Sequence, residues 1–178
     1  MSLRKASSYS KQKARPYTRK SRDKSKAYIK VIPNNKIVRY NFGEIGAFNR
    51  NKFKFGVSMI ADQRVLIRDN ALESGRMQIN KTLEMKLPKQ FYFGVKVYPH
   101  HILRNNKAAA GAGADRISTG MTQSFGVVEG RAAIVNAGQT IFFIATETEQ
   151  GARVAREALT MVKAKIPCRT KVLFGKLD

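Results

Sequence analysis

The clearest fold signal in the chain lies in residues 140–167, which read TIFFIATETEQGARVAREALTMVKAKIP. Residues 140–145 are a short apolar run, as expected of a buried strand, and the pattern then changes to the helical period of 3.6. From Thr148 to about Lys165 the apolar residues fall on one face, namely Ala155, Leu159, Val162 and Ile166. Pro167 ends this helix, because proline cannot continue its hydrogen-bond ladder. A strand followed directly by an amphipathic helix indicates a domain built of packed sheet and helix layers.

Shorter strand patterns lie on both sides of that stretch. Residues 132–135 are an apolar run, joined to the next strand by a turn at Ala137 and Gly138. Residues 172–174 are expected to add an edge strand. Two further runs alternate in the way typical of a strand with one buried face, and they are Phe53, Phe55, Val57 and Met59, and Phe91, Phe93, Val95 and Val97.

A first helix is predicted between those two alternating runs. Asn70 with Glu73 three residues later matches a capping box, in which each side chain bonds the backbone of the other. The inner face of this helix would carry Leu72, Ile79 and Leu83. Gly75 lies inside it at a cost of about 1 kcal/mol relative to alanine. We therefore expect another backbone to pack closely against Gly75.

The N-terminal part of the globular region predicts two more short strands. These are residues 28–32 and 37–42, separated by a turn at 33–35. The order is strands, helix, strands, helix, which predicts a single α+β domain over residues 27–178. Its strands are expected to be mixed or antiparallel and its helices to number two, with a basic extension at residues 1–26.

Positive charge is the dominant property of the composition. Lysine and arginine total 34 against 12 acidic residues, which gives a formal net charge of +22. Such a domain repels itself unless polyanions neutralise it, and nucleic acid is the densest polyanion in a cell. A membrane surface is the alternative partner, but no basic amphipathic helix with large aromatic anchors and no membrane-spanning apolar run is visible. The single cysteine fits a reducing cytoplasm, and the polar, basic residues after Met1 do not resemble a secretory signal.

Residues 1–26 differ from the rest of the chain. They contain one acid, Asp23, too few apolar residues for a core, and the cations Arg4, Lys5, Lys11, Lys13, Arg15, Arg19, Lys20, Arg22, Lys24 and Lys26. Such a segment is expected to be disordered alone and to become ordered along phosphates. Tyr9 and Tyr17 lie between the cations and could stack on bases. They favour an RNA-binding arm over the alternative, a solvated tail that binds nothing.

The strand pattern breaks between residues 98 and 125. A long loop in a compact domain is uncommon and is usually functional or disordered. The run of alanines and glycines at 108–114 has almost no bulk, so its backbone can approach RNA closely. Cations on both sides of that run are Arg104, Lys107 and Arg116. We predict an RNA-contacting loop at about residues 101–117, with a tolerated surface loop as the alternative.

Patterns for catalysis or metal binding are weak. The two histidines, His100 and His101, are adjacent and would point opposite ways on an extended segment, and Cys168 is distant in sequence. Residues 111–113 lack the lysine and hydroxyl residue of a phosphate-binding loop, and Ser124 has no glycine two residues before it, as a nucleophile elbow requires. The sequence therefore predicts no enzyme activity, no cofactor and no small-molecule substrate.

Several motifs together resemble one known family. They are residues 99–107 (PHHILRNNK), 113–117 (GADRI), 120–121 (GM), 125–126 (FG) and 138–139 (GQ), with 15–19 (RPYTR) and 32–37 (IPNNKI) upstream. They are similar to the archaeal and eukaryotic large-subunit ribosomal protein family called L-ten-e, whose bacterial counterpart is called L-sixteen. The similarity extends to residues 167–169, nearly the whole chain, and the run from Gly113 to Gly126 is its most specific part.

The resemblance implies a hammerhead-like α+β fold that binds large-subunit rRNA beside the aminoacyl-tRNA site. It also implies a loop directed toward the peptidyl-transferase centre, proximity to A-site and P-site tRNA, neighbouring ribosomal proteins as partners, and a late role in subunit assembly. By matching position and by charge, the expected RNA-binding residues are Arg15, Tyr17, Arg19, Lys20, Arg22, His101, Arg104, Asn105, Lys107 and Arg116.

The chain departs from the family pattern at a few positions. Ile134 stands where members often have arginine, with Arg131 earlier, and residues 5–9 (KASSY) replace a common Pro-Ala-Arg-Cys-Tyr. The end at Asp178, without the tail of many eukaryotic members, favours an archaeal source. Two other functions stay open at this point. A DNA-compacting protein would leave the alanine- and glycine-rich loop unexplained, and an RNA-modifying enzyme or nuclease would need a catalytic cluster near that loop.

Overall fold

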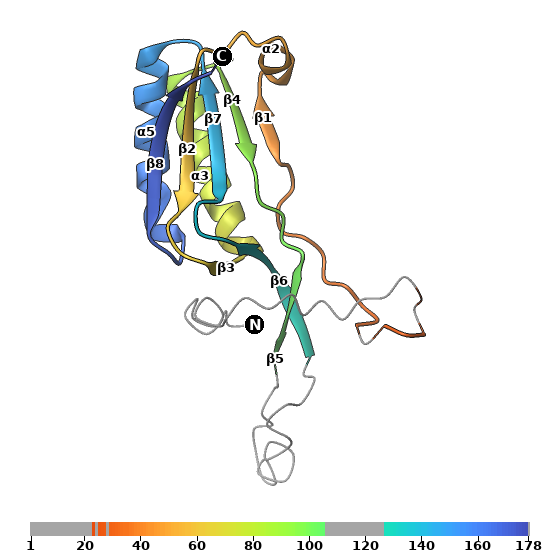
Figure 1. Ribbon diagram of the computed structural model, residues 1–178. Coiled ribbons are helices and arrows are strands. Elements are labelled where there is room, and N and C mark those ends of the chain that lie inside the picture. The colour runs from red at the N-terminus through yellow and green to blue at the C-terminus, as the bar shows by residue number, and fades with distance from the viewer. Residues whose placement is uncertain (1–22, 24, 28, 106–126, 178) are drawn as a thin grey trace.

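The computed structural model describes residues 23, 25–27, 29–105 and 127–177, which form two antiparallel sheets and three α-helices (Figure 1). The larger sheet has the order β1-β4-β7-β2-β8, with β1 (Asn41–Gly43), β2 (Phe55–Ala61), β4 (Phe91–Val95), β7 (Thr140–Thr146) and β8 (Thr170–Lys176). The smaller sheet has the order β3-β6-β5, with β3 (Val65–Arg68), β5 (His101–Asn105) and β6 (Val127–Val135). The helices are α2 (Ile45–Asn49), α3 (Asp69–Lys86) and α5 (Glu149–Val162), and a 3-10 turn at Lys163–Lys165 continues α5. The predicted α+β fold is confirmed.

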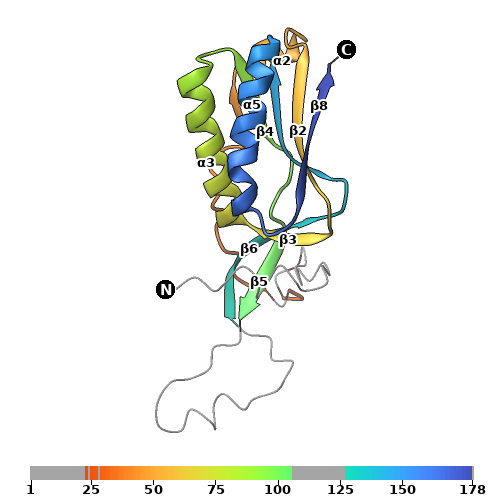
Figure 2. The ribbon, with the colours of Figure 1, turned by 90° about the vertical axis from the view of Figure 1, so that its left-hand side faces the viewer.

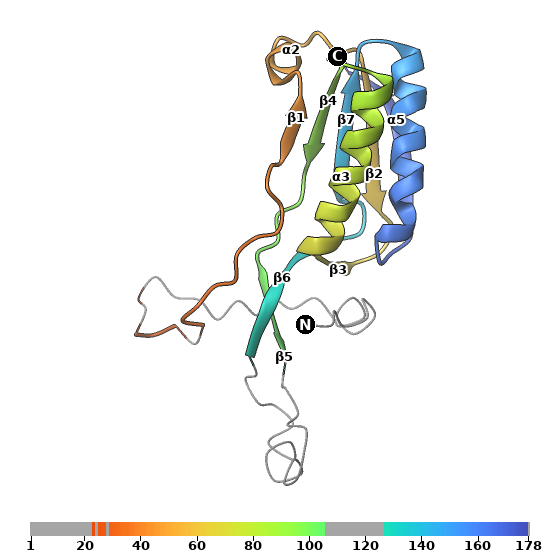
Figure 3. The same cartoon turned by 180° about the vertical axis from the view of Figure 1, so that it is seen from behind.

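Helices α3 and α5 lie side by side on one face of the larger sheet (Figures 2 and 3). Their apolar faces close the main core, whose fully buried side chains include Met59, Ile79, Leu83, Phe93, Phe142 and Leu159. Helix α5 begins after Thr148, whose hydroxyl accepts the Gly151 N–H at 3.1 Å. A cap of this kind typically contributes about 1 kcal/mol. The helical and strand periods of the sequence thus predict the main core correctly.

Gly75 marks the closest approach of α3 to its neighbours. A Cβ at this position would lie 2.9 Å from Val162 Cγ1 and 3.1 Å from Phe142 Cζ. Real Cβ atoms essentially never come as close as the contact with Val162, and the contact with Phe142 is tighter than most, so a side chain would force α3 away from α5 and the sheet. The predicted close packing is confirmed, but the neighbours are side chains of α5 and β7 rather than another backbone.

The opposite face of the larger sheet is partly covered by α2. Phe48 of this helix stacks on Tyr92 with ring centroids 4.0 Å apart, and both rings lie near Phe143. A second buried cluster of Phe53, Tyr92 and Ala145 forms there. Strand β4 is therefore buried on both faces, whereas its alternating sequence predicted one. Helix α2 is one more helix than the two predicted, and the sequence gives no sign of it because five residues are too few to show a helical period.

The segment before β1 does not form the two predicted strands. Only the end of the second, from Asn41, is a strand, and residues 29–40 lie outside any strand. Their apolar side chains do not share one buried face, since Ile29 and Ile37 are each 4% exposed while Val31 and Val38 are 77% and 80% exposed. Single buried residues therefore hold this segment against the domain, and no continuous backbone ladder does.

The predicted capping box at the start of α3 is also wrong. The helix begins at Asp69, whose carboxylate accepts the N–H of Asn70 at 2.8 Å and that of Lys36 at 3.3 Å. Glu73 instead makes a two-bond ion pair with Arg76, one turn further along. Because the Asp69 carboxylate already occupies the helix start, Glu73 pairs with Arg76 instead, and both side chains are mostly covered, with Arg76 lying over the Phe42 ring.

The turn before β7 joins two different sheets. Gly138 has a φ of +80°, in the left-handed region that favours glycine, as the predicted turn requires. Strands β6 and β7 on either side of it do not pair, because β6 belongs to the smaller sheet and β7 to the larger. The turn is confirmed, and it carries the chain from one sheet to the other. The predicted edge strand is confirmed as β8.

Candidate nucleic-acid interface

Strands β5 and β6 extend away from the helix-backed layer as a two-stranded projection, residues 101–105 and 127–135 (Figure 1). They pair antiparallel along the whole of β5, with a register shift after Leu103. The predicted loop therefore does not begin at residue 101. Residues 101–105 form a strand because Ile102 and Leu103 are buried against the domain, at 1% and 5% exposure. The rest of the predicted loop, from residue 106, lies outside the described residues.

The β5–β6 projection shares Ala133 and Val135 with the main core and has one small apolar cluster of its own. Leu66 of β3, Leu103 of β5 and Ala132 of β6 form a separate buried cluster of three residues. Ile134 packs partly buried against it. Because apolar burial is the main source of stability, this ladder is held less firmly than the layer above it. Its geometry suits a part of the chain that contacts another molecule.

Three of the ten predicted RNA-binding residues lie within the described part of the chain. His101, Arg104 and Asn105 are all on β5, and the strand brings them to the projection. Arg104 is half-buried and its positive charge acts on His101. The other seven lie outside the described residues, and they are Arg15, Tyr17, Arg19, Lys20, Arg22, Lys107 and Arg116.

His101 is half-buried, whereas its neighbour His100 is exposed. The Nδ1 atom of His101 is buried and has no hydrogen-bond partner among the described residues. Burial, reinforced by the charge of Arg104, lowers the pKa of His101 below its ordinary value of 6.5. The ring is therefore neutral at pH 7. It can offer a hydrogen bond or a stacking face to RNA, but no positive charge.

Aromatic rings lie beside the start of β5. Tyr40 stacks on Tyr98 with centroids 5.5 Å apart, and Tyr98 contacts His100 at 4.5 Å. Tyr98 and His100 are exposed. Exposed rings next to cations are typical of surfaces on which RNA bases stack. Sequence alone does not bring Tyr40 beside Tyr98 and His100, because their contact depends on how the segment before β1 folds back.

Arg131 of β6 joins the segment before β1 to the projection. Its Nε donates to the Pro33 carbonyl at 2.6 Å, and its Nη1 donates to the Tyr98 hydroxyl at 3.3 Å. The planar guanidinium holds its N–H donors at a fixed spacing that fits both acceptors, whereas the donors of a lysine ammonium rotate and have no such fixed spacing. The sequence analysis noted Arg131 only as a departure from the family pattern. In the structure Arg131 positions the rings of Tyr40, Tyr98 and His100 through its bond to Tyr98.

A cleft of about 560 Å³ lies between the root of the projection, the start of α3 and the segment before β1. Asp69 is its most buried charged group. Burial raises the pKa of the Asp69 carboxyl, and the N–H groups of Lys36 and Asn70 partly offset this. The charged side chains that line the cleft are Lys36, Arg68, Asp69, Glu129 and Arg131. Acids and bases are mixed, so the cleft is no simple anion site.

Catalytic and metal-binding groups do not gather in the part of the chain that the structure describes. No cluster of three His, Cys, Asp or Glu residues able to hold a metal ion is found among those residues. Cys168 is half-buried, and burial together with the nearby Asp62 raises the pKa of its thiol, which leaves it a weak nucleophile. None of the described helices combines the length and the apolar character needed to cross a membrane.

The α+β core, the two-stranded projection and the net charge of +22 define a class of basic α+β proteins whose charge suits a polyanionic partner. A comparison with family models then identifies the family within this class. The chain belongs to the ribosomal protein L16p/L10e family, whose model matches residues 12–173. Members of this family are structural proteins and not enzymes. The resemblance drawn from the sequence motifs is thereby confirmed.

Curated relatives agree with the family model over nearly the whole chain. The large ribosomal subunit protein uL16 of Methanococcus maripaludis (strain C7) is 41% identical over 177 residues, covering 99% of this chain and 96% of the relative. That of Staphylothermus marinus is 35% identical over 178 residues, with 99% and 96% covered. That of Nanoarchaeum equitans is 38% identical over 156 residues, with 86% and 83% covered. These three relatives are all archaeal.

Proposed function

We propose that this chain is a structural constituent of the large ribosomal subunit, where it binds large-subunit rRNA. The observation that carries this proposal is the family match across residues 12–173 in a chain of net charge +22. Relatives that share 35–41% of its residues are named large ribosomal subunit proteins. The phosphates of folded rRNA supply the negative charge that a chain of this composition needs.

Two parts of the chain are assigned to RNA. The first is the basic extension at residues 1–26, and the second is the segment around residues 101–117, which begins on β5. Arg104 lies on β5, and the exposed rings of Tyr98 and His100 lie beside that strand. Cations position a protein along phosphates while rings and amides contact bases. The projection therefore combines both kinds of contact.

The finer placement follows the family resemblance. We assign the protein to the region beside the aminoacyl-tRNA site, with the segment after β5 directed toward the peptidyl-transferase centre. There it would lie close to A-site and P-site tRNA, contact neighbouring ribosomal proteins and support late subunit assembly. The small residues at 108–114 support this placement, because a chain without bulk can pass between closely packed RNA helices.

The helix-backed layer has a mechanical role in this function. Its core includes Ala133 and Val135 of β6 and so fixes the root of the projection, while Arg131 fixes the rings of Tyr40, Tyr98 and His100. A rigid base reduces the entropy that the projection must lose when it binds RNA. The chain thus acts by geometry and charge, without a chemical step.

Sedimentation of a lysate through a sucrose gradient tests the proposal. The full-length chain is expected with large subunits, and washing with increasing salt should release it. With roughly six to ten phosphate contacts, affinity falls about a thousandfold or more between low and moderate salt. Migration as a free species, or with chromosomal DNA as the DNA-compacting alternative requires, would refute the proposal.

A further inference from the structure

The outer edge of strand β8 is open, and we propose that an extended, acidic segment of a neighbouring protein docks there and adds a strand to the larger sheet. This inference goes beyond rRNA binding, because it concerns a different part of the domain. The C-terminal end of β8 lies at the end of the larger sheet away from the β5–β6 projection (Figures 1 and 2). A partner bound there would leave the projection free for RNA.

The backbone of β8 has one unused edge. The strand pairs with β2, and no segment in the described ranges pairs with its other side. Leu177 N–H donates to the Lys54 carbonyl, which fixes which residues of the antiparallel ladder are hydrogen-bonded. By that alternation the residues bonded to β2 are Lys171, Leu173 and Gly175. The N–H and C=O groups that point outward then belong to Val172, Phe174 and Lys176.

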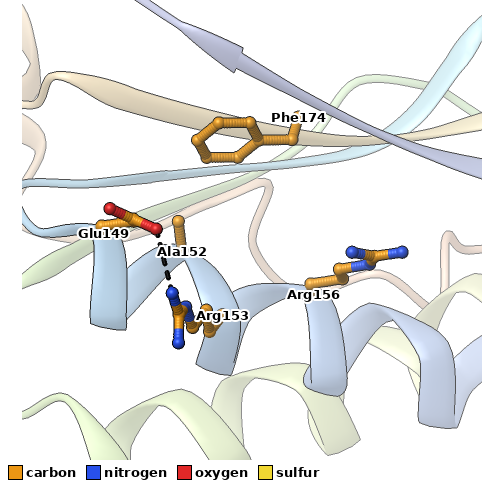
Figure 4. Close-up of a pocket in the computed structure, with 5 residues that line it drawn as sticks. All are labelled: Glu149, Ala152, Arg153, Arg156 and Phe174. Atoms are coloured by element: carbon orange, nitrogen blue, oxygen red, sulfur yellow. Dashed lines mark hydrogen bonds and ion pairs between the residues drawn. The ribbon is translucent and has the colours of Figure 1, made fainter.

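A groove of about 210 Å³ lies between α5 and β8, next to this edge (Figure 4). Its lining residues are Glu149, Ala152, Arg153, Arg156 and Phe174. The Phe174 side chain is 55% exposed, and its ring stacks on Phe55 with centroids 5.8 Å apart. The ring is therefore fixed but not covered. Alternate side chains of an added strand would point to the helix side of the sheet and pack on Phe174 and Ala152.

The charge of the groove favours an acidic partner. Arg153 pairs with Glu149 at 3.1 Å, but both side chains are mostly exposed, so that this pair is weak and easily exchanged. Arg156 makes no ion pair with a described residue, and Lys176 at the end of the strand is exposed. Carboxylates on an added strand would meet Arg153, Arg156 and Lys176 around an apolar floor.

The same features favour a protein over RNA as the occupant. The edge offers a carbonyl for every N–H, and carbonyl oxygens repel phosphates but match a peptide strand. Proteins usually protect long edge strands by charge, bulges or covering segments. This seven-residue edge carries exposed lysines only near its two ends, Lys171 and Lys176, and exposes Phe174 between them, while the adjacent Leu173 is 52% exposed on the other face. Such an edge is expected to be covered in the assembled particle.

Photo-crosslinking in purified large subunits tests the docking site. Full-length chains carry the photoreactive residue benzoylphenylalanine as Arg156→benzoylphenylalanine in the groove, or as Met161→benzoylphenylalanine in the control. Met161 is 46% exposed on the same helix but does not line the groove. We expect position 156, and not 161, to form an adduct with an acidic segment of another protein. Adducts with rRNA only, with a second copy of this chain, equally from both positions, or none at all, overturn the proposal.

A matched pair of variants tests the backbone contact itself. Lys176→Pro removes an outward N–H, while Lys176→Ala keeps it and removes the same charge. Losing one backbone hydrogen bond should lower the adduct yield from position 156 about threefold to tenfold in Lys176→Pro relative to Lys176→Ala. Equal yields overturn strand addition. Should Lys176→Pro not fold, the comparison of adducts from positions 156 and 161 still decides whether a protein segment docks in the groove.

Failure of this inference is distinguishable from failure of the proposed function. Co-sedimentation of each variant with large subunits is measured before irradiation, and it reports on incorporation alone. A chain that sediments with the subunit but gives no protein adduct at position 156 removes the docking site and leaves the ribosomal assignment intact. A chain that never sediments with the subunit contradicts both.

Discussion

The helix-backed layer and the β5–β6 projection differ in how much apolar surface holds them. The layer buries Phe93 and Phe142 completely between the larger sheet and two helices. The projection has a separate cluster of three buried residues at its root, Leu66, Leu103 and Ala132. This difference shows that stability and outward-facing polar groups are located in different parts of the chain. The layer supplies most of the stability, and the projection leaves more of its polar groups uncovered, as expected of the part that we propose to contact RNA.

The largest expected effect is on the layer. Phe93→Ala removes a completely buried ring that contacts Phe142 and Phe42, and it should lower the free energy of unfolding by about 3–5 kcal/mol. Phe174→Ala is the matched control. Its ring is 55% exposed and stacks only on Phe55 among the described rings, so we expect a loss of about 1 kcal/mol. Urea unfolding of the isolated chain, followed by circular dichroism, measures both. Similar losses in the two variants would contradict the claim that the layer supplies most of the stability.

The next effect falls where the projection meets the segment before β1. Arg131→Ala removes the bond to the Pro33 carbonyl and should lower the free energy of unfolding by about 1.5–2 kcal/mol. Ile37 N–H donates to the Asn35 side chain, so its amide exchange reports on this segment and should accelerate. Arg131→Lys keeps the charge without the planar fork, so its free energy of unfolding should lie between those of the native chain and Arg131→Ala. Unchanged exchange at Ile37 in Arg131→Ala would show that the arginine does not hold the segment.

The sequence predicted the layer well, because local patterns decide it. Helix α5 and strands β7 and β8 lie where a helical period and apolar runs place them. The same patterns could not predict which strands pair. β6 and β7 are neighbours in sequence but belong to different sheets, since strand pairing depends on contacts distant in the chain. The strands predicted between residues 29 and 40 do not form for the same reason, because no distant strand pairs with that segment in the described structure.

The site was harder to predict than the layer. The charge and motifs of the sequence identified His101, Arg104 and Asn105, which the structure brings together on β5. They could not show that β5 is a strand, because two apolar residues, Ile102 and Leu103, are too few to give a pattern. They also could not show that Arg131 holds Tyr98, since residues 33, 98 and 131 meet only in the fold.

Asp69, at the root of the projection, gives a smaller effect that depends on pH. Burial raises the pKa of its carboxyl above 3.8, so the folded chain holds this proton more tightly than the unfolded chain does. At pH values below 3.8 the Asp69 carboxyl is protonated in both the folded and the unfolded chain, so its titration does not change the free energy of unfolding there. As the pH rises through the window between the two pKa values, the stability of the native protein relative to Asp69→Asn should fall. Urea unfolding of both chains across this range measures the slope. A relative stability that rises with pH would mean that hydrogen bonds, and not burial, dominate at Asp69.

The smallest effect on stability is expected for Arg104→Ala combined with Lys107→Ala, while the effect on RNA binding is expected to be large. Arg104 is near the end of β5, away from the main core, so the free energy of unfolding should change by no more than about 0.5 kcal/mol. If each cation neutralises one phosphate, the slope of log affinity for large-subunit rRNA against log salt concentration should decrease by about 2. Lys81→Ala with Lys89→Ala is the matched control, because it removes the same charge from exposed positions on and beside α3. Filter binding at several salt concentrations separates the two pairs. Equal slopes would mean that net charge alone, and not the position of the projection, determines RNA affinity.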